Sequence, residues 1–470
     1  MKPIPPIKKR IMLLAILCVS LIILLLPQIL RMIRGNENLI GAESYEAIRI
    51  AGLVKDNATV DLLSGERIEF NLFHHLIALF ESIIPALVLA KIIPVIFGMC
   101  AAVLLSKVLS QLKFSQEQAI IAIILFLISP GYLYVYSTLN QYSLIIILFL
   151  AGASFLLADK HYLCGFCISA ILFIDILSFL IALALIFIHA ARSKEYPAFI
   201  KTVSIAALFL AIAVIFFSFI PRIELHLASP SFSTIFVNFG GILGLGIPLF
   251  ILFLISFAAN WKKAGLLITA CIVLLVSLSF FESGFTVFLN LFVVAFGALA
   301  LSLLINRRWE LQNIKFLTIL LIVCTLLFSS LSYINRLSSS QPSPHFSAAL
   351  MQVKTANPGF VLTHESYAPY VYYFSQKGMA WNRSLSNAPL DFRRDMHAIY
   401  LSRDLKETES LLQKHDIGLI FITKEMEEGL VWEKENQGLE FLLPNTPRFK
   451  LLYNFEDSTE KYTVWEYRKE

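Results

Sequence analysis

The sequence predicts an α-helical polytopic membrane protein with about eleven transmembrane helices, followed by a small C-terminal α/β domain outside the membrane. Of its 470 residues, 57% are hydrophobic and only 15% are charged, whereas a soluble globular protein carries about 25% charged residues. Apolar runs recur along the chain, and a run of about 18 residues or more can cross a bilayer as a helix. Because these runs are continuous rather than alternating, they favour helices over the strands of a membrane β-barrel.

The first apolar run begins directly after Lys8, Lys9 and Arg10. It is longer than the apolar region of a secretory signal peptide, and no small-residue cleavage site follows it, so we expect it to be retained as a span. Later runs are separated by short polar loops. The expected spans are residues 11–32, 83–108, 117–136, 141–158, 162–174, 176–191, 198–220, 240–259, 264–280, 283–305 and 314–334.

The fifth and sixth spans come from one apolar run of 29 residues, "YLCGFCISAILFIDILSFLIALALIFIHA". As a single helix this run would be about 43 Å long, which is long for one crossing and short for two. Asp175 lies near its middle, and a charge at the centre of the bilayer is costly. We therefore predict two short helices that turn at Asp175.

The lysines and arginines of the short loops support this choice and set the orientation. With the N-terminus in the cytoplasm, the short outer loops hold one cation, Arg222. The C-terminal domain is then extracytoplasmic, and Tyr132, Tyr134 and Tyr136 are expected in an aromatic belt at the membrane interface. The cations of the inner loops are Lys107, Lys113, Lys160, Arg192, Lys194, Lys201, Lys262, Lys263, Arg307, Arg308 and Lys315.

Two domains are expected. Residues 1–340 form the membrane domain, including a first external loop at about 33–82, and residues 341–470 form the extracytoplasmic α/β domain. The segment "SSSQPSP" between them has the composition of a linker. Beyond it, "GFVLTHE" and "IGLIFIT" are typical of buried strands, "DLKETESLLQKHD" of an amphipathic helix, and "FKLLYNFED" with "EKYTVWEY" of a closing hairpin.

The first external loop carries the residues that are best suited to take part in a reaction. Glu43 and Glu46 fall three residues apart in "ESYEAIRIA" and share a helical face, and the same spacing relates Glu46 to Arg49. His74 and His75 follow in "NLFHHLIALF". A carboxylate near a histidine can act as a general base, and arginine or histidine can hold phosphate oxygens. The alternative is a solvated ion-pair face with two packing histidines, and residue types alone do not exclude it.

The order of motifs in residues 30–190 resembles the GT-C superfamily of membrane glycosyltransferases, whose donors are sugars linked to lipid phosphates. The acidic residue, tyrosine and "IRIA" of "ESYEAIRIA" are similar to the family's first external loop. The stretch "FNLFHHLIALF" and the Ser-Pro turn in "ISPGYLYVYSTLNQYSLIIILFL" are similar to later family motifs. The resemblance is greatest to oligosaccharyltransferase-like and mannosyltransferase-like members, and it implies the GT-C fold.

The resemblance also implies roles for individual residues. Glu43 matches the family's carboxylate in the first loop and would be the general base. Glu46 and Asp175 are further candidates, although Asp175 could instead cap a helix. Arg222 could equally be an interfacial anchor. The candidates for binding the donor phosphate or the substrate are Arg49, His74, His75 and Arg222.

The sequence also departs from the family pattern. Glu43 replaces the usual aspartate, Asn140 and Gln141 stand where oligosaccharyltransferases carry a second acidic motif, and their Trp-Trp-Asp-Tyr-Gly motif is absent. We therefore expect no metal site and no metal-dependent transfer to asparagine. No glycine-rich phosphate loop is present, and the expected donor is a polyprenyl-phosphate sugar.

Three functions fit these observations. The first is a glycosyltransferase with membrane lipid and lipid-linked sugar as partners and a glycan, lipid or protein as acceptor; nucleic acid is not expected. The second is a catalytically inactive GT-C-like scaffold or partner subunit that binds another protein through its C-terminal domain. The third, a transporter or flippase, is disfavoured because the sequence shows no inverted repeat and few mid-membrane charges.

Overall fold

The structure, a computed structural model, divides into two compact units. The first comprises Met1–Arg34 and Glu69–Ser339, and the second comprises Gly35–Ile68 and Ser340–Glu470. In this division, residues 35–68 of the first external loop go with the C-terminal domain rather than with the helices. The structure describes residues 6–193, 200–205, 207–208, 235–239, 243–280, 284–380, 389–434 and 436–468.

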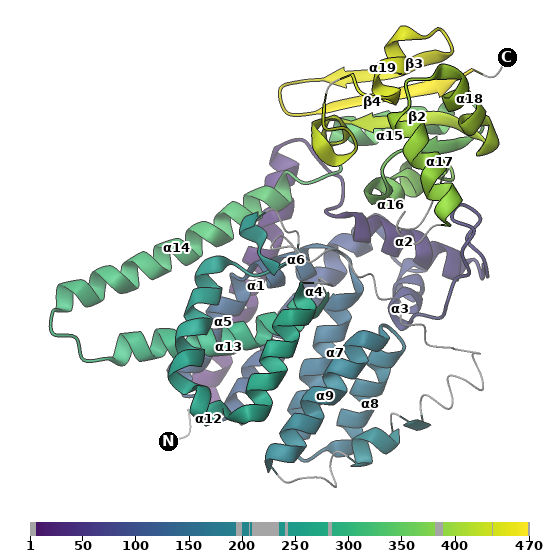
Figure 1. Cartoon of the computed structure of the whole chain (residues 1–470). Helices are drawn as coiled ribbons and strands as arrows, with labels where there is room; N and C mark the ends of the chain where they lie inside the picture. The colour runs from purple at the N-terminus through teal and green to yellow at the C-terminus, as the bar shows by residue number, and fades with distance from the viewer. Residues whose placement is uncertain are drawn as a thin grey trace. The chain divides into compact units, whose positions relative to one another are not determined.

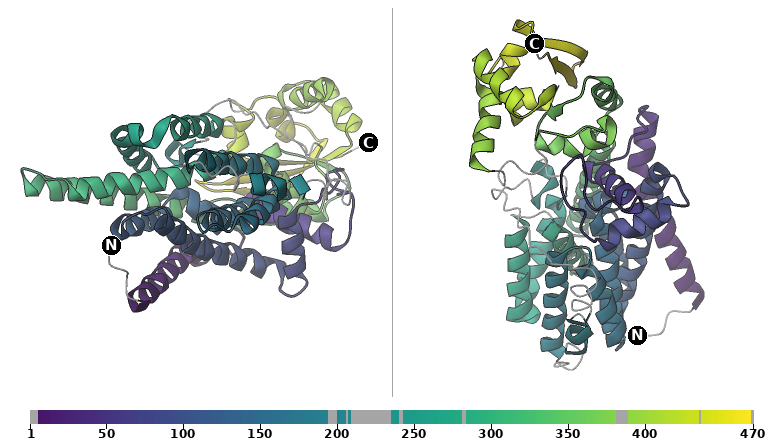
Figure 2. Two further views of the ribbon diagram at one scale, coloured as in Figure 1. Left: turned by 90° about the horizontal axis from the view of Figure 1, so that it is seen from below. Right: turned by 90° about the vertical axis from the view of Figure 1, so that its right-hand side faces the viewer.

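The first unit is a helical bundle (Figure 1). Within it, α4 packs against α1, α5 and α7, while α13 packs against α5 and α12, and α7, α8 and α9 lie side by side (Figure 2). Its elements are α1 (Pro6–Ile33), α3 (Leu72–Glu81), α4 (Ala86–Gln111), α5 (Gln116–Leu127), α6 (Pro130–Ser137), α7 (Gln141–Leu156), α8 (His161–Leu172), α9 (Ile176–Ser193), the 3₁₀ turn η1 (Val237–Phe239), α12 (Ile247–Ser279), α13 (Gly284–Asn306) and α14 (Gln312–Ser338).

Among the described residues, four helices are long and apolar enough to cross a membrane, and the bent pair of α5 and α6 raises the number to five. The four are Ile11–Ile33, Ala86–Gln111, Gly284–Asn306 and Gln312–Ser338. The polytopic helical class is thus confirmed, while the count of eleven spans stays a prediction. The single helix α12 covers most of two expected spans, 240–259 and 264–280, and most of 198–220 lies outside the described residues.

The predicted turn at Asp175 is confirmed, because α8 ends at Leu172 and α9 begins at Ile176. The Asp175 carboxylate accepts a hydrogen bond of 2.7 Å from the backbone N–H of Ser178. An N-terminal cap of this kind satisfies a donor that the first helical turn would otherwise leave unpaired. Asp175 therefore caps α9, the role that the sequence left open beside a functional one.

The third expected span is broken rather than straight, since α5 and α6 meet at an angle of 57°. Ser129 caps α6, Pro130 follows it at the first helical position, and the Asn290 side-chain amide donates to the Ser129 hydroxyl at 3.0 Å. A side-chain network of this kind satisfies backbone groups that a break in a membrane helix exposes.

All eight residues of α6 are buried within the protein. Tyr132, Tyr134 and Tyr136 retain 1%, 4% and 1% exposure, and the Tyr132 hydroxyl lies 2.5 Å from the hydroxyl of Ser20 on α1. The aromatic belt expected from these tyrosines is therefore wrong, because belt residues face the headgroup region. They pack inside the bundle instead.

The second unit contains a four-stranded sheet in the order β1-β2-β4-β3, in which β1 and β2 are parallel and the other pairs are antiparallel. The predicted strands, helix and closing hairpin are confirmed as β1, β2, α18, β3 and β4. The elements are α2 (Ala42–Lys55), α15 (Pro344–Thr355), β1 (Phe360–Leu362), the 3₁₀ turn η2 (Glu365–Tyr367), α16 (Ala368–Tyr370), the π-helix η3 (Val371–Ser375), α17 (Leu390–Leu401), α18 (Leu405–Lys414), β2 (Ile417–Thr423), the π-helical turn η5 (Met426–Leu430), α19 (Leu439–Asn445), β3 (Phe449–Glu456) and β4 (Lys461–Tyr467).

The core of this unit is aromatic. Phe346 on α15 is fully buried, and its ring centroid lies 5.2–5.4 Å from those of Tyr370, Phe421 and Tyr462. These edge-to-face contacts join α15 to the sheet and to α16, and each such pair contributes about 0.5–1.5 kcal/mol beyond the area it buries.

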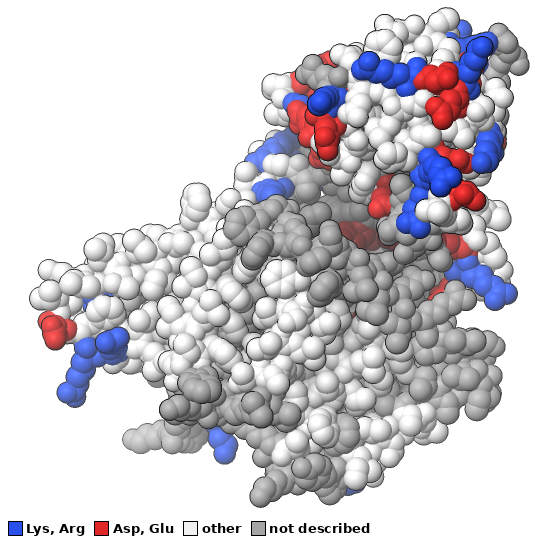
Figure 3. All heavy atoms as spheres, viewed as in Figure 1, with Lys and Arg blue, Asp and Glu red and all other residues white. Residues whose placement is uncertain are grey.

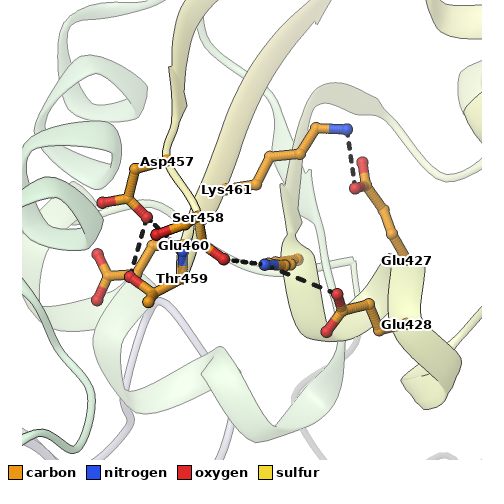
Figure 4. Close-up of polar contacts among 8 residues, drawn as sticks. Glu427, Glu428, Asp457, Ser458, Thr459, Glu460 and Lys461 are labelled. Carbon is orange, nitrogen blue, oxygen red and sulfur yellow. Dashed lines mark hydrogen bonds and ion pairs between the residues drawn. The ribbon is translucent and has the colours of Figure 1, made fainter.

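The hairpin of β3 and β4 closes through its own side chains (Figure 4). The Asp457 carboxylate accepts hydrogen bonds of 2.7 Å from the backbone N–H groups of Thr459 and Glu460. Lys461 then pairs with Glu427 on η5 at 2.8 Å. An aspartate that bonds its own following backbone is a common way to form a tight turn.

Charged side chains gather over the C-terminal unit in the view of Figure 3, whereas the described membrane helices show few of them. A further charged group, Arg307, Arg308 and Glu310, occupies the turn between α13 and α14. The distribution is the one expected of a lipid-facing bundle with a water-exposed domain.

Gly98 offers a test of the bundle packing. A Cβ added there would lie 2.5 Å from Leu24 Cδ1 and 2.9 Å from Tyr136 Cβ, and overpacking of this kind costs about 1–3 kcal/mol. We expect Gly98→Val to lower the melting temperature in detergent by several degrees. Gly52→Ala is the control, because nothing lies within 4 Å of the added atom; equal melting temperatures in the two variants would contradict the packing.

Candidate functional site

Helix α2 presents two different faces. Its buried residues are Ser44, Tyr45, Ala47, Ile48 and Ala51, and their spacing gives one apolar stripe. Glu43 and Glu46 are exposed on the other side. The sequence "ESYEAIRIA" therefore combines a docking face with an acidic face.

Glu43 lies in the first turn of α2, where the helix dipole stabilises a negative charge. Glu46 lies one turn further along the same exposed side. Although its side chain lies on the exposed face, protein around the carboxylate desolvates it and raises its pKa, while the charge of Arg49 acts in the opposite direction. A carboxylate with a raised pKa is better suited to accept a proton.

Tyr45 anchors the buried face of α2 to the C-terminal domain. Its ring centroid lies 5.5 Å from that of Tyr370, 4.8 Å from Tyr373 and 5.0 Å from Phe374. Its hydroxyl accepts a hydrogen bond of 2.8 Å from the backbone N–H of Leu39. The tyrosine of the motif is thus a packing residue with a satisfied polar tip.

Arg49 forms an ion pair with Asp61, a residue that the sequence analysis did not single out. The two side chains retain 12% and 3% exposure, and the Arg49 guanidinium lies 4.8 Å from the ring centroid of Tyr372. The sequence led us to expect that Arg49 binds the donor phosphate, but the Arg49 guanidinium already donates to a carboxylate in the same unit. The signal for Asp61 was the turn sequence "DLLSG", which places an acid before Ser64 and Gly65.

His74 and His75 lie in the first turn of α3, which Asn71 caps by accepting from the Phe73 N–H at 2.9 Å. His75 Nδ1 lies 2.9 Å from the Asn71 carbonyl oxygen, and its ring centroid lies 4.4 Å from that of Phe70. These contacts place His75 in a packed, partly buried setting.

The start of α3 is tied to the turn that holds Asp175. The Leu72 N–H donates to the Phe173 carbonyl at 2.9 Å, and the Asn71 amide donates to the Ile174 carbonyl at 3.2 Å. Segments 70–75 and 173–175 therefore lie together in the first unit.

Arg222, another candidate for the donor phosphate, lies outside the described residues. Within the described part of the chain, no group of three or more His, Cys, Asp or Glu could hold a metal ion.

Sequence comparison finds no match, either to a family model or to a curated protein. The structure, however, is similar to solved membrane glycosyltransferases. Oligosaccharyltransferase from Archaeoglobus fulgidus, tethered with an acceptor peptide, has a TM-score of 0.62 at 13% identity, over 88% of this chain and 69% of that one. Oligosaccharyltransferase AglB from Archaeoglobus fulgidus, in complex with an inhibitory peptide and a dolichol-phosphate, has a TM-score of 0.53 at 12% identity, over 89% of this chain and 70% of that one.

Two further structures extend the comparison. ArnT from Cupriavidus metallidurans in the apo state has a TM-score of 0.55 at 9% identity, over 97% of this chain and 98% of that one. Arabinofuranosyltransferase AftD from Mycobacteria has a TM-score of 0.55 at 14% identity, over 98% of this chain and 40% of that one. At these identities the likeness shows the fold, and the predicted GT-C fold is confirmed.

The buried ion pair predicts how stability depends on pH. Burial raises the pKa of Asp61, but hydrogen bonds from Ser64 and Arg49 outweigh that effect, so the net pKa is lowered. The pair therefore stabilises the folded state above the unfolded pKa of about 3.9, and this contribution is lost as the pH falls through the lower folded value. We expect Asp61→Asn to lower the melting temperature at pH 7 and to flatten its decline below about pH 4. A melting profile parallel to that of the native protein would contradict this assignment.

Proposed function

We propose that this protein is an integral-membrane glycosyltransferase that moves a sugar from a polyprenyl-phosphate-linked donor to an acceptor on the extracytoplasmic face. The observation that carries the proposal is the fold, because the likeness to ArnT extends over 97% of this chain and 98% of that one. The exposed carboxylate of Glu43, in the first turn of α2, supplies a group suited to the reaction.

In the proposed reaction, the oxygen of an acceptor hydroxyl attacks the anomeric carbon of the donor sugar. Glu43 takes the proton of that hydroxyl during the attack. The new carbon–oxygen bond forms while the bond from the anomeric carbon to the lipid phosphate breaks. The electron pair of that bond leaves with the phosphate, and the anomeric configuration inverts. A positioned carboxylate base of this kind contributes about 10²–10⁴-fold to a rate.

The donor phosphate requires cations or hydrogen-bond donors at the level of the headgroups. We assign this role to Arg222 and to His74 or His75, and we remove Arg49 from it because Asp61 occupies its guanidinium. The dolichol-phosphate in an oligosaccharyltransferase of the same fold supports a lipid-phosphate carrier. The acceptor is a glycan, a lipid or a protein, and the scheme requires no divalent metal.

The alternative is a GT-C-like scaffold or partner subunit without catalysis. The engaged state of Arg49 favours it, because one of the cations expected for the donor is committed to an ion pair. The glutamate at position 43, where the family usually has aspartate, also favours the scaffold. In this case the C-terminal domain binds a protein partner, and no donor is consumed.

The proposal includes the eleven-span topology, with a cytoplasmic N-terminus and an extracytoplasmic C-terminal domain. It predicts that a cysteine replacing Lys450 on β3 is labelled from the extracytoplasmic side, and that one replacing Lys113 after α4 is not. The measurement is labelling by a membrane-impermeant maleimide in oriented vesicles, in a background without the native cysteines. Labelling of both positions from one side would overturn the topology.

The central prediction concerns Glu43. Glu43→Gln keeps the size of the side chain but cannot take a proton, so we expect transfer of labelled sugar from polyprenyl-phosphate donors to fall about 100-fold or more. Asp56→Asn, at the other end of α2, is the control and retains activity. Equal activity in Glu43→Gln and native protein would exclude Glu43 as the base. A native protein that transfers no sugar from a broad panel of donors would favour the scaffold.

A further inference from the structure

We propose that Asp61 is a positioning residue of the transfer reaction, which acts by holding Arg49 and thereby fixing the rotation of α2 against the C-terminal domain. In this view the C-terminal domain is part of the catalytic apparatus, because it sets the direction in which Glu43 points. The inference rests on the proposed function and deepens it, since it names residues outside the acidic face on which the reaction depends.

Asp61 is itself held rigidly by the turn that contains it. Its backbone N–H donates to the Glu66 carbonyl at 2.8 Å, and its carbonyl accepts from the Gly65 N–H at 2.7 Å. Its carboxylate accepts from the Leu63 N–H at 3.0 Å and from the Ser64 hydroxyl at 2.6 Å. Gly65 has a φ of 71°, a conformation that glycine adopts without strain. The carboxylate therefore has a fixed place from which to bind Arg49.

Arg49 is held on two sides. Asp61 is the one side chain in the described part of the chain that accepts a hydrogen bond from its guanidinium. The ring of Tyr372 lies beneath the guanidinium carbon at 4.8 Å. Since both partners are more than nine-tenths buried, the pair and the cation–π contact are shielded from water and leave the arginine little freedom.

The same short segment of the C-terminal domain holds both anchors of α2. Tyr45 packs against Tyr370, Tyr373 and Phe374, while Arg49 packs against Tyr372. These two anchors are four residues apart, so they lie on one face of the helix. Residues 370–374 therefore hold α2 at two points along one line.

Glu43 lies on the opposite side of this line. At about 100° per residue, it is roughly 160° around the helix axis from Tyr45. With side chains, a helix has a radius of about 5–6 Å, so a rotation of about 10° would move the carboxylate by about 1 Å. A displacement of that size can cost about 100-fold in rate. Loss of one anchor should therefore reduce turnover without altering how the donor binds.

The first experiment compares Asp61→Asn, Arg49→Gln and the double variant with native protein in lipid nanodiscs, using the polyprenyl-phosphate donor that the native protein accepts. We expect each single variant to lower kcat at least tenfold while the KM for the donor changes less than twofold. The double variant is expected to be no worse than either single variant, because the two residues act as one unit. Asp56→Asn is the matched control and leaves kcat unchanged.

Hydrogen exchange of α2 provides a readout that does not depend on activity. We expect amides of residues 42–55 to exchange at least tenfold faster in Asp61→Asn, while those of β2 and β4 keep native protection. Unchanged exchange in α2 would overturn the inference even if the protein is a transferase. If native protein transfers no sugar, the proposed function fails, and the exchange data then decide separately whether Asp61 holds α2.

A second pair of variants covers the case in which Asp61→Asn does not fold. Tyr372→Phe keeps the ring beneath Arg49, whereas Tyr372→Leu removes it. We expect native kcat in the first and at least a fivefold loss in the second, again at constant KM for the donor. A raised donor KM with native kcat, or equal activity of the two Tyr372 variants, would overturn the positioning role.

Discussion

The hydrocarbon interior of a membrane offers no water to pair with backbone N–H and C=O groups, and the first unit is shaped by that constraint. Its long helices satisfy these groups internally, and the bent pair of α5 and α6 needs help from side chains. At the break between α5 and α6, Ser129 caps the new helix and Asn290 binds Ser129. At the far end of α6, Asn140 caps α7 and bonds the Thr138 hydroxyl at 2.7 Å. Buried polar residues in this unit therefore mark the places where side chains satisfy backbone groups that a helix break leaves unpaired.

The second unit follows a different rule, because side-chain contacts supply much of its order. Aromatic rings fill its core around Phe346, while the ion pair of Arg49 and Asp61 ties α2 to the turn that follows it. The aromatic contacts contribute stability through the area they bury and their edge-to-face geometry. The ion pair is directional and contributes a defined orientation, and orientation is what a carboxylate such as Glu43 requires if it is to act as a base.

Several features could be read from the sequence because their causes are local. Asp175 interrupts an apolar run, so a turn follows, and the alternating residues of "EKYTVWEY" give the last strand. Other features depend on partners far along the chain. Tyr132, Tyr134 and Tyr136 have the composition of an interfacial belt, and sequence cannot tell whether such rings meet lipid or protein. Asp61 follows Arg49 by 12 residues, a separation that does not by itself predict contact. Tyr372 lies more than 300 residues further along the chain than Arg49.

The discontinuous make-up of the second unit has a consequence for biosynthesis. Helix α2 leaves the ribosome early, whereas the ring cluster that receives Tyr45 begins at Tyr370. At a synthesis rate of about 5–20 residues per second, α2 waits roughly 15–60 seconds for its partner. During that interval its apolar stripe has no docking surface from the C-terminal domain. Completion of this unit is therefore a late event in synthesis, and a chain that stops before residue 370 carries an acidic helix without the segment that orients it.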